Sequence, residues 1–501
     1  MCKKYNVLDA RKRVFFIVME LLEKAGRKAP CRSRTVRKES REESRYENHF
    51  VHTPCGPVQG AAGGADGVSV FRGIRYATAG RWEYPRQVTH WDGVYDAANF
   101  GACSFQPRAF YSEEDVPEKA FYYNEFRRGE HYDYSEDCLF LNIWAPDDAK
   151  NAPVLFYIHG GGFLGGCGHE KHFDGTAWCK KGVVAVTINY RLGPMGFLCL
   201  PELAARDGHT GNYAVFDQMA ALCWVRDNIA AFGGDPGQVT LMGQSAGAMS
   251  VQQLCVSPMT NGLFRGAVMM SGGGVSRLLG AAQKAEEAYP FWQAVRQKLG
   301  AADFAALCGA EPQALFAAFA EARKEQKNPM AGCGPVVDGV FLTESAAEAA
   351  KAGRQKNIPY LMGSTSEDVV PPIVHKMAKG WARLQADQGK QPSYAYFFSR
   401  QLPGDEKGAW HSADLWYAFG TLDSCWRPFT EWDRALSEAM VSYLTNFAKT
   451  SDPNGPGLAE WLPVKKGQTQ VLRFGDRDIT MGGVSVARLT HTMLTKPNVG
   501  E

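Results

Sequence analysis

The chain lacks the features that mark several large classes of protein. Its 501 residues contain no N-x-Ser/Thr acceptor for N-glycosylation and, despite 13 cysteines, no C-x-x-C pair. An odd number of thiols cannot all pair within the chain, so neither a disulfide scaffold nor a zinc framework is expected. Together these features favour a reducing compartment, and we expect the protein to be cytoplasmic.

Long apolar runs are missing as well. The one near the start, residues 14–19, ends at Glu20, which makes it too short for a membrane span. No small-residue cleavage site follows this run, so we expect neither a secretory signal nor an integral membrane segment.

The chain has almost no excess of either charge, because 55 Lys and Arg balance 53 Asp and Glu. The net charge of +2 gives no general attraction to nucleic acid, so we expect no nucleic-acid partner. The balance fails in residues 1–47, which hold 14 basic and 7 acidic side chains. We expect a helix over residues 7–26, suited to docking on the globular body or to binding a membrane surface or partner, and a solvated tether over residues 27–47. The sequence thus predicts a basic N-terminal part, residues 1–47, and one globular domain, residues 48–501.

The globular part alternates between two patterns, and its 45% hydrophobic and 22% charged residues exclude fibrous or disordered classes. Short β-branched or aromatic runs predict buried strands at residues 139–144, 153–159, 183–189, 239–242, 267–271, 358–362 and 394–398. Longer amphipathic runs predict helices at residues 214–231, 246–256, 281–299 and 432–450. This alternation predicts an α/β fold with a mostly parallel central sheet flanked by helices, in which ligands bind beyond the C-terminal ends of the strands.

The most specific motif is Gly243-Gln244-Ser245-Ala246-Gly247, between the strand at residues 239–242 and the helix at residues 246–256. A G-x-S-x-G run in that context is the pattern of a nucleophile elbow, where a tight turn exposes the serine hydroxyl. The glycines lack Cβ, which lets the strand and helix pack closely. We therefore expect Ser245 to be a catalytic nucleophile, with a plain structural turn as the alternative.

A second glycine-rich loop, His159-Gly160-Gly161-Gly162-Phe163, follows the strand at residues 153–159. Backbone N–H groups in such a loop stabilise the negative charge that acyl transfer places on the former carbonyl oxygen. We expect the donors to be Gly161, Gly162 and Ala246. Residues 160–165 also fit G-x-G-x-x-G, but poor helix formers follow them, so a dinucleotide site is not expected.

Further motifs occur in the order and spacing of one family, at residues 71–77, 81–82, 135–143, 189–191, 232–236, 446–448 and 452–454. With the two glycine-rich loops, they make residues 53–463 resemble the carboxylesterase type-B family, the cholinesterase-like branch of the α/β-hydrolases, and its bacterial para-nitrobenzyl-esterase-like members in particular. The resemblance implies an α/β-hydrolase fold and hydrolysis of small-molecule carboxylic esters, with no metal or other cofactor.

The resemblance also implies the partners of the nucleophile. His411 lies in a stretch, residues 408–415, that resembles the catalytic-histidine motif of the family, and α/β-hydrolases follow the chain order Ser, acid, His. The family usually ends the preceding acid segment with Asp-Glu-Gly, whereas residues 367–369 read Glu-Asp-Val. The register of this segment puts Asp368 at the position of the acid, with Glu367 as the alternative.

Two departures from the family change the expectations. Gln244 stands where the family usually has Glu, which removes a negative charge beside the nucleophile and weakens any preference for cationic substrates. Cys103 and Cys138 occupy positions that form a disulfide in secreted relatives, and in this chain we expect both to be free thiols.

The residues that bind substrate are harder to identify. We expect Phe163, Gln244 and Trp410 to contact substrate in an apolar pocket, although burial in the core explains the aromatic residues equally well. His169 and His172 form an H-x-x-H pair with no further ligands nearby in the sequence, so we expect no metal site there.

The expected reaction is two-step ester hydrolysis through an acyl-enzyme on Ser245, with His411 as general base and then general acid. Activity should fall at acidic pH as a histidine with an ordinary pKa of ~6.5 becomes protonated. Two alternatives stay open. One is amide or lactone hydrolysis on the same triad, and the other is an adhesion or scaffolding role without catalysis.

Overall fold

The computed structural model describes residues 49–276, 282–328, 330–468 and 470–496. The helix and tether expected over residues 1–47 lie outside the described residues, so the division at residue 47 stays a prediction.

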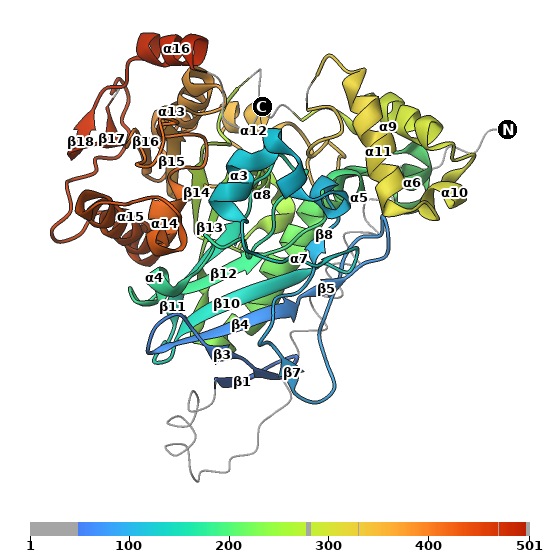
Figure 1. The fold of residues 1–501 in the computed structure, drawn as a ribbon, viewed down its shortest axis with the longest axis horizontal. Coiled ribbons are helices and arrows are strands. Elements are labelled where there is room, and N and C mark those ends of the chain that lie inside the picture. The colour runs from blue at the N-terminus through green and yellow to red at the C-terminus, as the bar shows by residue number, and fades with distance from the viewer. Residues whose placement is uncertain (1–48, 277–281, 329, 469, 497–501) are drawn as a thin grey trace. The chain divides into compact units, whose positions relative to one another are not determined.

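An 11-stranded sheet forms the centre of the described part (Figure 1). From one edge to the other the strands are β18 (Ile479–Gly482), β17 (Val471–Phe474), β16 (Ser393–Phe398), β15 (Tyr360–Thr365), β14 (Gly266–Met270), β13 (Gly234–Gln244), β11 (Ala152–Ile158), β12 (Val184–Ile188), β10 (Phe140–Pro146), β4 (Val68–Arg75) and β3 (Ala61–Ala62). The strands from β12 to β17 run parallel, and those at both edges are antiparallel. The predicted α/β architecture with a mostly parallel sheet is confirmed.

Both faces of this sheet are buried. In β11, Val154, Phe156 and Ile158 join one hydrophobic core, while Leu155 and Tyr157 join a second core on the opposite face. This alternation follows from the two-residue period of a strand, and it explains why the strand reads as a continuous apolar run.

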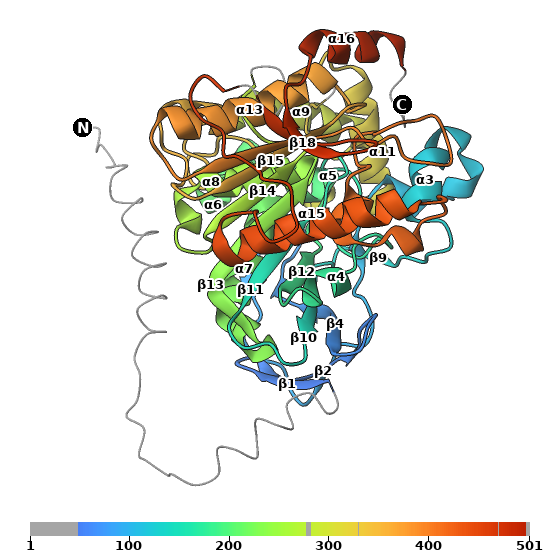
Figure 2. The same cartoon turned by 90° about the vertical axis from the view of Figure 1, so that its left-hand side faces the viewer.

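Helices supply the other side of each core. Helices α7 (Tyr213–Asn228), α8 (Ala246–Val256), α9 (Ala285–Leu299), α11 (Pro312–Lys324) and α13 (Pro371–Asp387) contribute to the first core. The second core is closed by α4 (Thr176–Cys179), α14 (Leu415–Phe419) and α15 (Glu431–Thr450), and Figure 2 shows α15 lying across that face of the sheet. The remaining helices are α3 (Ala120–Phe126), α5 (Gly193–Phe197), α6 (Pro201–Asp207), α10 (Phe304–Cys308), α12 (Ala346–Lys351) and α16 (Val486–Thr495).

Shorter strands form three small sheets beside the large one. In the first, β2 (Gly56–Gln59) lies between β1 (Phe50–Thr53) and β7 (Tyr95–Asp96) and pairs with both. The other two pair β5 (Ala77–Thr78) with β6 (Arg86–Gln87), and β8 (Cys103–Ser104) with β9 (Tyr134–Ser135). Most of these strands have two residues, too few to produce a periodic pattern that sequence reasoning could detect. Within the described ranges, every helix is too short or too polar to cross a membrane.

A buried ion pair joins the loop after β12 to α7. Arg191 donates from Nε to Asp217 Oδ2 at 2.8 Å and from Nη2 to Asp217 Oδ1 at 2.7 Å. The side chains are 5% and 0% exposed, so water screens neither charge. Arg191 Nη1 also donates to the carbonyl oxygen of Glu83 at 2.8 Å, which ties a third segment to this point.

Replacing Asp217 with asparagine should lower the free energy of unfolding by about 3–5 kcal/mol, because the buried guanidinium of Arg191 loses its counter-charge. Asp207→Asn is the matched control, since Asp207 pairs with Arg206 at the surface and its loss should cost within about 1 kcal/mol. Denaturant midpoints of the two variants and the wild type check this. Equal losses in the two variants would contradict the assigned role of burial.

Candidate active site

The turn between β13 and α8 has the geometry of a strained nucleophile elbow. Ser245 sits at its apex with φ 56° and ψ −124°, a region that residues with a Cβ rarely adopt. Its neighbours Gln244 and Ala246 are buried, whereas Ser245 is only half-buried. The turn therefore lifts one hydroxyl out of an otherwise closed core.

Close packing around the turn explains the two motif glycines. A Cβ on Gly243 would lie 2.4 Å from the backbone of Gly247, and a Cβ on Gly247 would lie 2.0 Å from the carbonyl oxygen of Ile158. Real Cβ atoms do not approach other atoms this closely, so either substitution would push α8 away from the sheet. The G-x-S-x-G spacing is thus required by the backbone.

Ser245, His411 and Asp368 form one continuous hydrogen-bonded chain. His411 Nε2 is 2.7 Å from Ser245 Oγ, and His411 Nδ1 is 2.5 Å from Asp368 Oδ1. The Asp368 side chain is fully buried and also accepts from the main-chain N–H groups of Thr365 and Val369. These bonds fix the carboxylate so that one oxygen faces the histidine ring.

The sheet explains how residues so far apart in sequence meet. Ser245 follows β13, Asp368 follows β15 by three residues, and His411 lies in the loop after β16. These strands are parallel, so their carboxyl ends lie at the same edge of the sheet.

Glu367, the alternative acid, has a different set of contacts. Its carboxylate accepts from the main-chain N–H of Ala409 at 2.9 Å, from Lys496 Nζ at 3.1 Å and from the hydroxyl of Ser366. Its own N–H donates to the carbonyl oxygen of Ala409 at 3.0 Å. Glu367 therefore joins the acid loop to the histidine loop, and the structure gives it no contact with the His411 ring.

The glycine-rich loop after β11 lies directly against the elbow. A Cβ on Gly160 would be 3.0 Å from Ser245 Cβ, so the two loops touch. Gly161 and Gly162 have φ values of 108° and 63°, which favour glycine, and a Cβ at Gly162 would meet open space. Within the described residues, the N–H groups of Gly161, Gly162 and Ala246 donate to no backbone acceptor. Three amides beside the serine hydroxyl are thus available for a ligand.

Two polar residues that act on His411 were not assigned this role from the sequence: one holds its backbone, and the other influences its pKa. The Gln244 side chain is 3% exposed and donates from Nε2 to the carbonyl oxygen of His411 at 2.7 Å. Asp414 is fully buried, accepts from the hydroxyl of Tyr396 at 2.6 Å, and has its pKa raised to about 7 by burial. Only its position three residues after His411 could have singled it out, because its partner Tyr396 lies on β16, 18 positions earlier in the chain.

The aromatic residues expected to contact substrate lie in the core. Phe163 is 1% exposed and packs edge-on against Phe197, with ring centroids 5.1 Å apart. Trp410 is 0% exposed and packs against three aromatic residues of α3: Phe121, Tyr122 and Phe126. Their contact with substrate stays a prediction, whereas their packing against neighbouring rings is observed.

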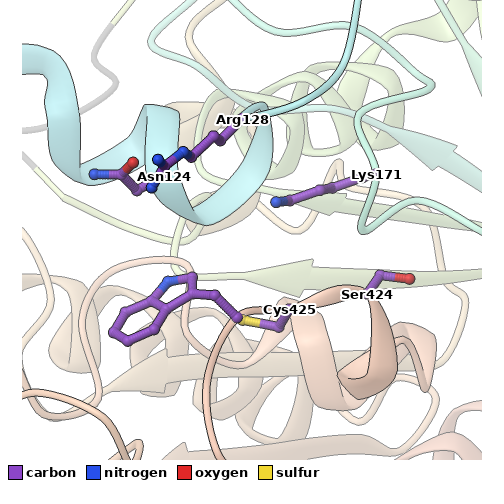
Figure 3. Close-up of a pocket in the computed structure, with 6 residues that line it drawn as sticks. Asn124, Arg128, Lys171, Ser424 and Cys425 are labelled. Atoms are coloured by element: carbon purple, nitrogen blue, oxygen red, sulfur yellow. The ribbon is translucent and has the colours of Figure 1, made fainter. Parts of the chain in front are cut away.

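A surface cavity of about 550 Å³ lies between α3 and the turn at residues 424–426 (Figure 3). It is lined by Asn124, Arg128, Lys171, Ser424, Cys425 and Trp426, none of which belongs to the triad. Trp426 Nε1 donates to the buried carboxylate of Glu125 at 3.0 Å. Because Phe126, the next residue of α3, packs against Trp410, α3 contributes both to this cavity and to the packing beside His411.

The expected free thiols and the histidine pair can also be located. Cys103 and Cys138 are both buried free thiols. His172 stacks on Phe126 with ring centroids 3.8 Å apart, and burial lowers its pKa to about 3, so it is a neutral core residue. His169 has different contacts, which include one between its Nε2 and Cys103 Sγ at 3.6 Å.

Comparisons with known proteins identify the family of the chain. A model of the carboxylesterase family matches residues 47–380 and 372–487. The chain is 31% identical over 493 residues to the para-nitrobenzyl esterase of Bacillus subtilis (strain 168), covering 87% of this chain and 96% of the relative. It is 31% identical over 514 residues to the bile salt-activated lipase of Rattus norvegicus, covering 82% of this chain and 79% of the relative.

Solved structures of related esterases have the same fold. The structure of a thermophilic PNB esterase superimposes with a TM-score of 0.76 at 28% identity, covering 89% of this chain and all of that chain. A second PNB esterase structure gives a TM-score of 0.75 at 28% identity, covering 89% and 99% of the two chains. The chain therefore belongs to the carboxylesterase family, and it is a carboxylic ester hydrolase with the α/β-hydrolase fold.

Proposed function

We propose that Ser245, His411 and Asp368 are the catalytic triad of this esterase. His411 removes the proton from the Ser245 hydroxyl, which attacks the ester carbonyl carbon and forms a tetrahedral intermediate. His411 then donates that proton to the leaving alcohol. Water, deprotonated by the same ring, attacks the acyl-enzyme and releases the acid. The observation that carries this proposal is the unbroken chain of hydrogen bonds from Asp368 through His411 to Ser245.

The amides of Gly161, Gly162 and Ala246 are the proposed oxyanion hole. Support comes from the contact between the glycine-rich loop and the elbow, and from the lack of backbone acceptors for these three N–H groups among the described residues. Donors already oriented before the reaction cost no reorganisation when charge develops, and each contributes several kcal/mol of stabilisation in such sites.

Glu367, Gln244 and Asp414 take positioning roles in this proposal. Glu367 fixes the histidine loop through Ala409, and Gln244 holds the backbone of His411. The charge of Asp414 raises the pKa of His411. The absence of a charged Glu at position 244 fits a neutral ester better than a cationic one, because no additional carboxylate lies next to the nucleophile.

A substrate series tests the reaction class. Nitrophenyl esters of increasing acyl length should be hydrolysed, and each should react faster than its matched nitroanilide and than a lactone of similar size, since the phenolate leaving group needs less protonation. Ser245→Ala supplies the background rate. A nitroanilide that is cleaved faster than its matched ester would favour the amidase alternative, and preference for the lactone would favour the lactonase alternative.

The pH dependence should follow His411. Burial lowers the pKa of His411, but the charge and hydrogen bond of Asp368 outweigh it and raise that pKa above the ordinary value. The charge of Asp414 also raises the pKa of His411. The protonated ring cannot act as a base, so kcat/KM should rise with pH through a midpoint above ~6.5.

Asp414→Asn is the informative variant for this profile. It removes a carboxyl group whose pKa is raised to about 7 and whose ionised form favours the protonated ring, but leaves Asp368 in place, so the midpoint should move to lower pH. Profiles of kcat/KM from pH 5 to 9 measure this. A wild-type midpoint below ~6.5 or an upward shift in Asp414→Asn would contradict the assignment.

We further propose that the protein acts in the cytoplasm. Eleven cysteines in the described ranges are free thiols and most are buried, a state that a reducing compartment preserves.

A further inference from the structure

Three side chains that can bind a metal meet outside the triad. Cys103 comes from β8, and Cys167 and His169 come from the loop that continues from Gly161 and Gly162. The two sulfur atoms and a ring nitrogen all lie within 4.8 Å of one another. Neither the family resemblance nor the proposed esterase mechanism uses this cluster.

The spacing fits the coordination sphere of zinc. Zinc binds thiolate sulfur at about 2.3 Å and imidazole nitrogen at about 2.0–2.1 Å in tetrahedral geometry, which separates a sulfur from a nitrogen ligand by roughly 3.6 Å. The observed distance from Cys103 Sγ to His169 Nε2 is 3.6 Å. A thiol–imidazole hydrogen bond would explain the contact between Cys103 and His169. It would not explain why Cys167 also lies beside both side chains.

Hydrogen bonds hold the two ligand-bearing segments together. Asn189 accepts through Oδ1 from the N–H of Gly168, between Cys167 and His169, at 2.7 Å. Its Nδ2 donates to the carbonyl oxygen of Ala102, next to Cys103, at 2.9 Å. One asparagine side chain thus bridges both segments at the cluster, so little rearrangement is needed to bind an ion.

Gln106 makes a second bridge between the same segments. Its Oε1 accepts from the N–H of Gly166 at 2.9 Å, and its Nε2 donates to the carbonyl oxygen of Gly166 at 3.1 Å. The His169 ring also stacks on Phe100, with centroids 4.6 Å apart and planes 9° from parallel. The ligand side chains are therefore supported on several sides.

A buried ion pair adjoins the cluster, because Glu170 directly follows His169 in the chain. The guanidinium of its partner Arg108 is 8% exposed. It donates to Glu170 from Nη1 at 2.7 Å, and its Nη2 has no partner among the described residues.

We propose that Cys103, Cys167 and His169 bind one Zn²⁺ ion that fastens β8 to the loop carrying Gly161 and Gly162. Binding replaces two S–H bonds with two Zn–S bonds and releases two protons. The resulting site is electrically neutral, because two thiolates balance the ion and the imidazole is uncharged. Water completes the tetrahedron.

Cobalt provides a direct probe, because tetrahedral Co²⁺ bound to thiolates has visible d–d bands and a near-ultraviolet thiolate charge-transfer band. Reduced, metal-free protein with the full chain should take up one equivalent of Co²⁺ with both signals, and Zn²⁺ should displace it. Cys103→Ser, Cys167→Ser and His169→Gln should each weaken the affinity by more than ~100-fold.

Matched controls separate this site from the other thiols. Cys179→Ser removes a buried cysteine on α4 and should bind Co²⁺ like the wild type. His169→Gln alters only a half-buried side chain, so it keeps the test valid if a cysteine variant fails to fold, as judged by circular dichroism. Unchanged Co²⁺ spectra in the three ligand variants would overturn the proposal. A Cys103–Cys167 disulfide in protein purified without reductant, combined with no metal uptake after reduction, would also overturn it.

Discussion

Replacing Ser245 with alanine should reduce kcat/KM for ester hydrolysis by about 10⁵–10⁶-fold, because the residual rate then comes from binding and oxyanion stabilisation without a nucleophile. The fold should persist, since among the described residues the hydroxyl makes one side-chain hydrogen bond, with His411. Alanine also carries a Cβ, so the positive φ at this position is no more strained than in the wild type.

Steady-state kinetics on one nitrophenyl ester, together with a thermal unfolding curve, measure both parts of this prediction. Ser442→Ala, on the half-buried surface of α15, is the control and should keep wild-type kinetics. Loss of activity accompanied by loss of the folded state would leave folding as the cause. An active, folded Ser245→Ala protein would exclude this serine as the nucleophile.

Asp368→Asn should lower kcat by about 10³–10⁴-fold. An asparagine cannot stabilise the imidazolium that forms during the reaction. Its amide can also donate to Nδ1, which favours the tautomer with the proton on Nε2, where it cannot act as a base towards Ser245. The effect should fall mainly on kcat, because Asp368 is fully buried and contacts the histidine.

Glu367→Gln is the matched comparison, one position earlier in the chain. Glutamine keeps an oxygen that can accept from Ala409, so activity should fall by less than about tenfold, the equivalent of one ordinary hydrogen bond. The ratio of the two effects distinguishes the two carboxylates. A larger loss in Glu367→Gln than in Asp368→Asn would reverse the assignment of the acid.

The sequence predicts those parts of the fold that depend on local pattern. Helix α8 was expected at residues 246–256 and is observed there, because the motif at Ser245 sets its start. The strands at residues 153–159 and 394–398 agree with β11 and β16 within a residue at each end, since buried parallel strands read as apolar runs. Helix α9 was expected from residue 281 but begins at Ala285, because the backbone of Lys284 is extended, with φ −66° and ψ 150°.

Contacts between distant segments could not be predicted in the same way. Gln244 was expected to contact substrate, which stays a prediction, while the observed acceptor of its amide is the His411 backbone 167 positions away. Glu367 was considered only as an acid, whereas its observed partner is the N–H of Ala409. The Cys103, Cys167 and His169 cluster was missed for the same reason, because its two segments lie 64 residues apart and share no sequence motif.

Labelling with a fluorophosphonate tests the central claim most directly. The reagent forms a covalent bond from phosphorus to an activated serine oxygen and releases fluoride, so it reports a nucleophile without requiring the natural substrate. One phosphonyl group per chain, mapped to Ser245 by peptide mass spectrometry, with labelling and esterase activity lost together and no label on Ser245→Ala, is the predicted result. Complete loss of activity with the label on a different residue, or full activity in a chain labelled at Ser245, would contradict the account.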